Sequence, residues 1–202
     1  MYELDEFQKD ALKELGNLGS GRASSELSKL IDMKVNLDVS FVDLVPTDDV
    51  PDLVGGPRML VVGTYAPVQG DVIGTIVVVF PIKSALMFVD LVNKREFGTT
   101  NALSIKDRDT IREIGDILSK SYLQTFAEFL NINAEHTTPR IVSAFGESLP
   151  DFVLLNIQEK HALLLKTEFN IPTAEKINGN FVLLLTSESI EKLLDALKEK
   201  LQ

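Results

Sequence analysis

A pattern of spaced polar and glycine residues near the start of this 202-residue chain occurs again 99 residues further on. The first copy reads Asp10-x-x-x-Glu14-x-Gly16-Asn17-x-x-Ser20, and the second reads Asp109-x-x-x-Glu113-x-Gly115-Asp116-x-x-Ser119. Further along, Gly74–Phe80 aligns with Gly179–Leu185 at an offset of 105, and a helix follows each. We therefore interpret the chain as a single domain built from a tandem duplication, with repeats at about 1–98 and 99–202.

Each repeat is predicted to run helix, helix, strand, strand, strand, helix. Apolar residues at three- and four-residue steps predict a helix over about 3–20. The cluster Gly16, Gly19 and Gly21 indicates either close backbone approach or a bend before a second helical stretch over 20–31. Strands are predicted at 35–42, 59–66, 72–80, 140–143, 152–157, 161–169 and 181–185, helices at 84–92, from 104 and at 189–201, and a linker at 93–101.

These elements indicate an α+β fold with an internal pseudo-two-fold. A half of about 100 residues is thin for a core of its own. We therefore expect the two sets of strands to merge into one continuous, mainly antiparallel sheet that long helices flank.

Composition excludes several kinds of protein. Thirty acidic residues against twenty basic ones give a net charge of −10, which disfavours binding to nucleic acid or to an anionic membrane surface. The absence of cysteine excludes disulfide scaffolds and thiolate zinc sites. The first residues are acidic where a secretory signal would be basic, and the longest apolar stretch, Val72–Ile82, is roughly half of what a spanning helix needs. A cytoplasmic location is expected.

The first copy of the motif places its polar residues on one face of a helix. Asp10, Glu14, Asn17 and Gly21 step by four, three and four residues, which forms a stripe separate from the apolar one. Such a stripe is most often a solvated face. It also has a chemical use, because a carboxylate pairs with a cation, and a carboxamide both donates and accepts hydrogen bonds and so holds a water molecule.

The spacing onward from the motif resembles a known family. In the second copy, Pro139 follows Asp116 after 22 intervening residues, and this pattern resembles the signature of the CheC/CheX/FliY family of chemotaxis phosphatases. The first copy, Glu14-Leu-Gly-Asn17-Leu-Gly-Ser-Gly21, looks like the first motif of its CheC branch. The resemblance implies a CheC-like fold and dephosphorylation of a phosphorylated CheY-type response regulator.

The resemblance also implies roles for individual residues. Asn17 would orient the attacking water, and Glu14 would pair with the active-site lysine of the regulator; Glu113 and Asp116 would form a second catalytic pair. Asp10, Gly21, Asp109 and Lys120 match positions expected to contact the partner. No metal ligand is implied on this chain, since the Mg²⁺ is expected on the regulator. CheD, the receptor deamidase, is a further implied partner.

Two departures from the family pattern bear on activity. Ser40 stands where the first copy would carry the proline, which we expect to shape a strand edge rather than touch phosphate. Asp116 replaces the carboxamide in the second copy, and a carboxylate offers no donor and repels phosphoryl oxygens. Lys120 adds bulk and charge where the first copy has Gly21. The second site is therefore predicted to be weak or silent.

Two other functions stay open at this stage. The first is a non-catalytic adaptor that binds CheD or the flagellar switch. The second is a hydrolase that uses Glu14 or Glu113, which would require both motifs to converge on one cleft. His136 and His161 are interpreted as surface or strand residues rather than ligands. A monomer is expected, because an internal duplication mimics a dimer.

Overall fold

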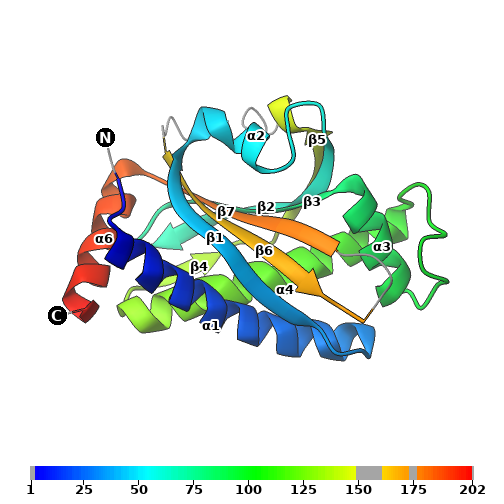
Figure 1. Cartoon of the computed structure of the whole chain (residues 1–202), viewed down its shortest axis with the longest axis horizontal. Helices are drawn as coiled ribbons and strands as arrows, with labels where there is room; N and C mark the ends of the chain where they lie inside the picture. The colour runs from blue at the N-terminus through cyan, green and yellow to red at the C-terminus, as the bar shows by residue number, and fades with distance from the viewer. Residues whose placement is uncertain (1–2, 149–160, 173–176, 202) are drawn as a thin grey trace.

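The computed structural model describes residues 3–148, 161–172 and 177–201, which form one seven-stranded sheet with helices packed against it (Figure 1). The helices are α1 (Glu6–Ile31), α2 (Val50–Leu53), α3 (Ile82–Val92), α4 (Ile105–Leu130) and α6 (Ser187–Leu201). The strands are β1 (Asn36–Pro46), β2 (Leu60–Gly70), β3 (Gly74–Pro81), β4 (Ala134–His136), β5 (Arg140–Phe145), β6 (His161–Asn170) and β7 (Ile177–Leu185). The predicted α+β fold with an antiparallel sheet is confirmed. The strand predicted at 152–157 lies outside the described residues.

The order of the strands interleaves the two halves of the chain. It runs β1-β6-β7-β3-β2-β4, with β5 also paired to β2. The first strand of each half therefore pairs with the strands of the other half, β1 with β6 and β4/β5 with β2. At the centre Val77 pairs with Val182, and these two residues are related by the offset of 105. The pairing thus has a pseudo-two-fold axis at this point, as expected for a duplication, whereas the boundary near residue 98 stays a prediction.

Helices cover one face of the sheet more fully than the other. The long helices α1 and α4 lie side by side on one face, and α2 lies on the opposite side (Figure 1). Residues 74–80 of β3 are all buried, because side chains of both faces enter apolar clusters, Ile76 on the α1 side and Val77 on the α2 side. This double burial explains why the central strands read as uninterrupted apolar runs.

Helix α1 continues through its glycines without the bend that was one of the two readings of the cluster. A Cβ atom at Gly16 would lie 2.9 Å from Leu165 Cδ2, and one at Gly19 would lie 2.8 Å from Tyr122 Cδ1. Close approach to the sheet and to α4 is therefore the reason for these two glycines. The buried Tyr122 hydroxyl also bonds Ser20 Oγ at 2.8 Å and Thr167 Oγ1 at 3.1 Å, and its burial raises the pKa of Tyr122.

The position occupied by Ser40 and Pro139 interrupts the strand ladder in both halves. The register between β1 and β6 shifts between Val39 and Phe41, which leaves Ser40 unpaired. In the second half the strand breaks at the same place, between β4 and β5. Such an interruption tolerates proline because no ladder hydrogen bond is needed there. The backbone at this position can therefore carry either serine, as in the first half, or proline, as in the second.

The linker before α4 is anchored rather than loose. The fully buried carboxylate of Asp90 accepts hydrogen bonds from the amides of Gly98 and Thr99 at 2.8 and 3.0 Å and from the Thr100 hydroxyl. Arg95 pairs with the buried Asp107 in the first turn of α4 at 2.7 Å. These contacts fix where α4 begins.

The glycines of α1 offer a matched pair of variants. Gly19→Ala should lower the free energy of unfolding by about 1–3 kcal/mol, because the methyl group would overlap Tyr122. Gly21→Ala should raise it by up to about 1 kcal/mol, because no heavy atom lies within 4 Å of the added Cβ and alanine is the better helix former. Urea unfolding measures both. Equal effects of the two substitutions would contradict the close packing of α1 on α4.

Candidate functional site

The predicted site lies on the solvent-facing side of α1. Asp10, Glu14 and Gly21 are exposed there, while Asn17 is half-buried at the border with β1. The four residues thus share one accessible face, as their spacing predicts. The helix begins with a capping box in which Asp5 and Gln8 bond each other's backbone amides, and this gives the face a defined start.

Side chains of α1 satisfy the free edge of β1. The amide of Val35 donates to Ser28 Oγ at 2.9 Å, that of Leu37 to Ser24 Oγ at 2.9 Å, and that of Val39 to Asn17 Oδ1 at 3.2 Å. A strand at the edge of a sheet exposes every second amide, and these amides need acceptors. The three bonds fall at every second residue, one at Val35 just before β1 and two within it, and hold α1 in register with β1.

The bond from Val39 fixes which end of the Asn17 carboxamide faces outward. Since the Val39 amide requires an acceptor, the carbonyl oxygen of Asn17 turns toward β1. The NH₂ group and the second lone pair of Oδ1 are then left for another partner. Glu14, one helical turn earlier, presents a carboxylate beside them. A donor, an acceptor and a negative charge are therefore held together on a rigid helix.

Gly21 has no packing reason to be glycine. It is exposed, and no heavy atom lies within 4 Å of a Cβ built on it. Glycine inside a helix costs about 1 kcal/mol in stability relative to alanine.

The next residue, Arg22, forms an ion pair with Glu128 of α4. This contact raises the pKa of Arg22 and lowers that of Glu128.

The second copy of the motif has different surroundings. Asp116 and Lys120 line a cleft of about 310 Å³, together with Glu135 and His136 of β4. Glu113 and Asp109 are exposed on α4, and Asp109 pairs with Arg112. The sequence interpretation missed that His136 lies with Asp116, because only the contact between α4 and β4 brings them together.

The two motifs do not share one cleft. Glu14 lines a groove with Phe129, whereas Asp116 lines the cleft beside β4. A hydrolase in which the two motifs converge is therefore not supported. Across the described ranges, no group of three or more His, Cys, Asp or Glu side chains could hold a metal ion. No described helix combines the length and the apolar character needed to cross a bilayer.

The sequence and the fold of this chain are similar to those of known proteins. The model of the CheC-like family matches residues 7–39, which contain the first motif and most of α1. The CheY-P phosphatase CheC of Bacillus subtilis is 26% identical over 199 residues, covering 96% of this chain and 95% of that protein. The resemblance to the CheC/CheX/FliY family is confirmed.

Two further relatives extend the CheC-like match. A putative CheY-P phosphatase CheC1 of Halobacterium salinarum is 20% identical over 81% of this chain and 83% of its own length. FliY of Thermotoga maritima superposes with a TM-score of 0.80 at 19% identity, covering 98% of both chains. This structural likeness establishes the CheC-like fold over nearly the whole chain.

The double role of Asn17 can be separated by two substitutions. Asn17→Ala removes the acceptor of the Val39 amide and should lower the free energy of unfolding by about 1 kcal/mol. Asn17→Asp keeps an oxygen at that place and should change it by less than about 0.5 kcal/mol. Urea unfolding of the two variants checks this. If Asn17→Ala is as stable as the wild type, the Val39 bond does not hold the side chain.

Proposed function

We propose that this CheC-like protein dephosphorylates a phosphorylated CheY-type response regulator, with Asn17 as its main catalytic residue. The observation that carries the proposal is the Asn17 carboxamide, whose carbonyl is held by the Val39 amide at 3.2 Å, which leaves its NH₂ group for another partner one helical turn from Glu14. The relative from Bacillus subtilis, a CheY-P phosphatase, supports it along nearly the full chain.

The proposed reaction requires the enzyme mainly to position a water molecule. The substrate is an acyl phosphate on an aspartate of the regulator. A water oxygen bonds to phosphorus while the bond from phosphorus to the aspartate oxygen breaks, which yields the free carboxylate and inorganic phosphate. The Asn17 carboxamide would hold that water in line with the breaking bond. Glu14 would pair with the regulator's lysine and set the register of docking, and the Mg²⁺ that neutralises the phosphoryl oxygens would belong to the regulator.

The second motif is proposed to contribute little. Asp116 offers no hydrogen-bond donor and would repel the phosphoryl oxygens. Lys120 stands where the first motif has the unobstructed surface of Gly21. Asp116 and Lys120 line a cleft that also holds Glu135. Asp10, Gly21 and Asp109 remain proposed partner contacts, and Glu113 remains the counterpart of Glu14.

We also propose that the protein binds CheD, which the family resemblance implies. A monomeric state is proposed because an internal duplication mimics a dimer, and a cytoplasmic location is proposed from the acidic first residues and the short apolar stretches. The alternative function is a non-catalytic adaptor for CheD or the flagellar switch, which the altered second motif favours. An adaptor would bind the phosphorylated regulator without shortening the lifetime of its phosphoryl group.

Asn17→Asp tests the proposed catalytic role directly. The variant keeps the bond to Val39 but loses the NH₂ donor and gains a charge, so the accelerated dephosphorylation should fall at least about 100-fold. The measurement is the decay of the phosphorylated regulator with and without the protein. Glu199→Gln, at an exposed position of α6, is the control. Full activity of Asn17→Asp would overturn the assignment.

Asp116→Asn tests the inactivity of the second site. In the Asn17→Asp background, it should restore part of the activity if the missing carboxamide is the only defect. Combined with Lys120→Gly, it should restore more, because the residue equivalent to Gly21 is then also open. No gain from either change would show that the second motif has lost more than its amide.

A further inference from the structure

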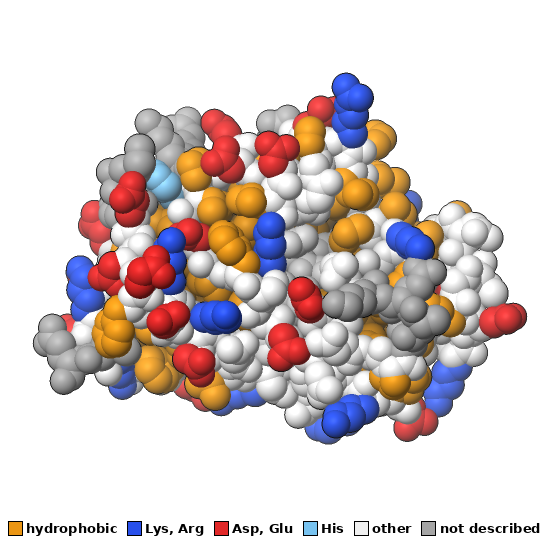
Figure 2. All heavy atoms as spheres, in the orientation of Figure 1, with side chains coloured by type: hydrophobic (Ala, Val, Ile, Leu, Met, Phe, Trp, Pro, Cys, Tyr) orange, Lys and Arg blue, Asp and Glu red, His pale blue; other side chains and the backbone are white. Residues whose placement is uncertain are grey.

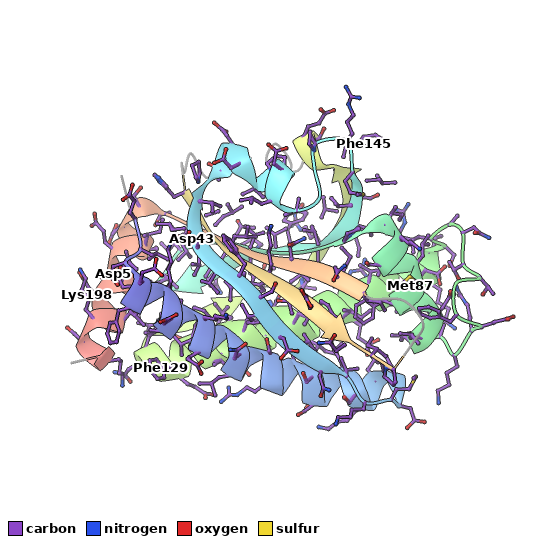
Figure 3. The ribbon with its side chains drawn as sticks, viewed as in Figure 1. Asp5, Asp43, Met87, Phe129, Phe145 and Lys198 are labelled. Atoms are coloured by element: carbon purple, nitrogen blue, oxygen red, sulfur yellow. The ribbon has the colours of Figure 1, made fainter. Side chains whose placement is uncertain are left out.

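An apolar groove lies directly beside the proposed site. It has a volume of about 320 Å³ and is lined by Phe7, Ala11, Leu15 and Leu18 of α1 and by Phe129 near the end of α4. Phe7 is 62% exposed, Leu18 57% and Phe129 37%. Exposed apolar side chains that adjoin one another mark a surface that a partner covers. Figure 3 shows Phe129 beside the first turns of α1.

The groove and the catalytic motif face the same partner. Successive residues of a helix are about 100° apart, so Glu14 projects between Asn17 on one side and Leu18 on the other. Asp10 and Glu14 also line the groove. A protein that brings a cation to Glu14 and a phosphoryl group to Asn17 therefore cannot avoid Leu18.

The second half of the chain serves as an internal comparison. At the offset of 99, the counterparts of Phe7, Ala11 and Phe129 are Lys106, Thr110 and Leu30. The Thr110 hydroxyl accepts a hydrogen bond from Asn93 at 3.2 Å, so the segment after α3 contacts that place. The counterparts of Leu15 and Leu18, Ile114 and Ile117, are also apolar, so the two halves differ at the positions of Phe7, Ala11 and Phe129. The groove beside Asn17 therefore carries two exposed phenylalanine side chains that the second half lacks.

We propose that this groove is the apolar half of the docking surface for the phosphorylated regulator, an inference that rests on the proposed function. The occupant is an apolar patch of the regulator beside its active-site lysine. Charge supports this choice, because the rim of the groove carries Asp10 and Glu14 and the chain has a net charge of −10. Acidic and hydrophobic side chains lie next to one another where α1 begins (Figure 2).

The test is the steady-state kinetics of two groove variants. Phe7→Lys copies the residue of the second half, and Leu18→Ser removes the apolar side chain next to Asn17. Each should raise KM for the phosphorylated regulator about tenfold or more and leave kcat within about twofold, whereas Asn17→Asp should lower kcat. Phe145→Ser is the matched control, since Phe145 is 53% exposed and lies far from Phe129 in Figure 3.

The outcomes separate this inference from the proposed function. If the wild type accelerates dephosphorylation but both groove variants keep its KM, the groove assignment is wrong and the phosphatase stands. If the wild type does not accelerate dephosphorylation, the groove assignment and the proposed phosphatase function are both wrong. An unchanged KM with loss of CheD binding, or with loss of self-association in light scattering, would assign the groove to CheD or to a second copy instead. Because Phe7 and Leu18 are exposed, either variant should fold, and urea unfolding confirms this.

Discussion

The exchange of strands between the two halves is the constraint on which the rest of the structure depends. β1 pairs with β6, and β4/β5 pair with β2, so each half completes the sheet of the other. The central contact between β3 and β7 then relates the halves by a pseudo-two-fold at Val77 and Val182. Because of this symmetry, α1 and α4 lie on the same face, and each brings its motif to a strand whose ladder is interrupted. The position of Asn17 therefore depends on the pairing of both halves, because α1 packs on β1 and β1 is held in place by β6.

A symmetric scaffold carries two unequal surfaces. Tyr122, whose hydroxyl joins Ser20 to Thr167, fills the space between the long helices, and its counterpart in the first half is Ala23. The interior has thus diverged together with the surface. On the outside, one half retains a carboxamide beside an apolar groove, while the other has a carboxylate in a polar cleft with His136. We interpret this as specialisation of the first half for the partner, with the second half supporting it.

Much of the fold could be predicted, because the spacing of apolar residues within each element and the repeated motif are visible in the sequence. Helix α4, strand β6 and the order of the elements follow from periodicity and from the offset of the two motifs. Which strands of one half pair with strands of the other could not be predicted, since these contacts join residues between 64 and 134 positions apart. Strand β4 has three residues and leaves too short a pattern to detect. The continuity of α1 depends on Leu165 and Tyr122, which lie far from the glycines in sequence.

The sequence predicts that the residues of the candidate site share one face of a helix, but it does not predict the contacts that their side chains make. The spacing of Asp10, Glu14 and Asn17 predicts a shared face, and the structure places all three on it. The bond from the Val39 amide could not be foreseen, because it arises from the edge position of β1. The groove could not be predicted either, because Phe129 reaches α1 only when α4 packs against it.

Nuclear magnetic resonance of the Asn17 side-chain amide can show whether this carboxamide meets the phosphorylated regulator. The protein is labelled with ¹⁵N and titrated with a CheY-type regulator carrying beryllofluoride, a stable mimic of the phosphoryl group. The Asn17 NH₂ signals should shift strongly upon binding, while the backbone amide of Val39 stays protected from hydrogen exchange. Binding without any change at the Asn17 NH₂ group, or an unprotected Val39 amide in the free protein, would contradict the proposed role of Asn17.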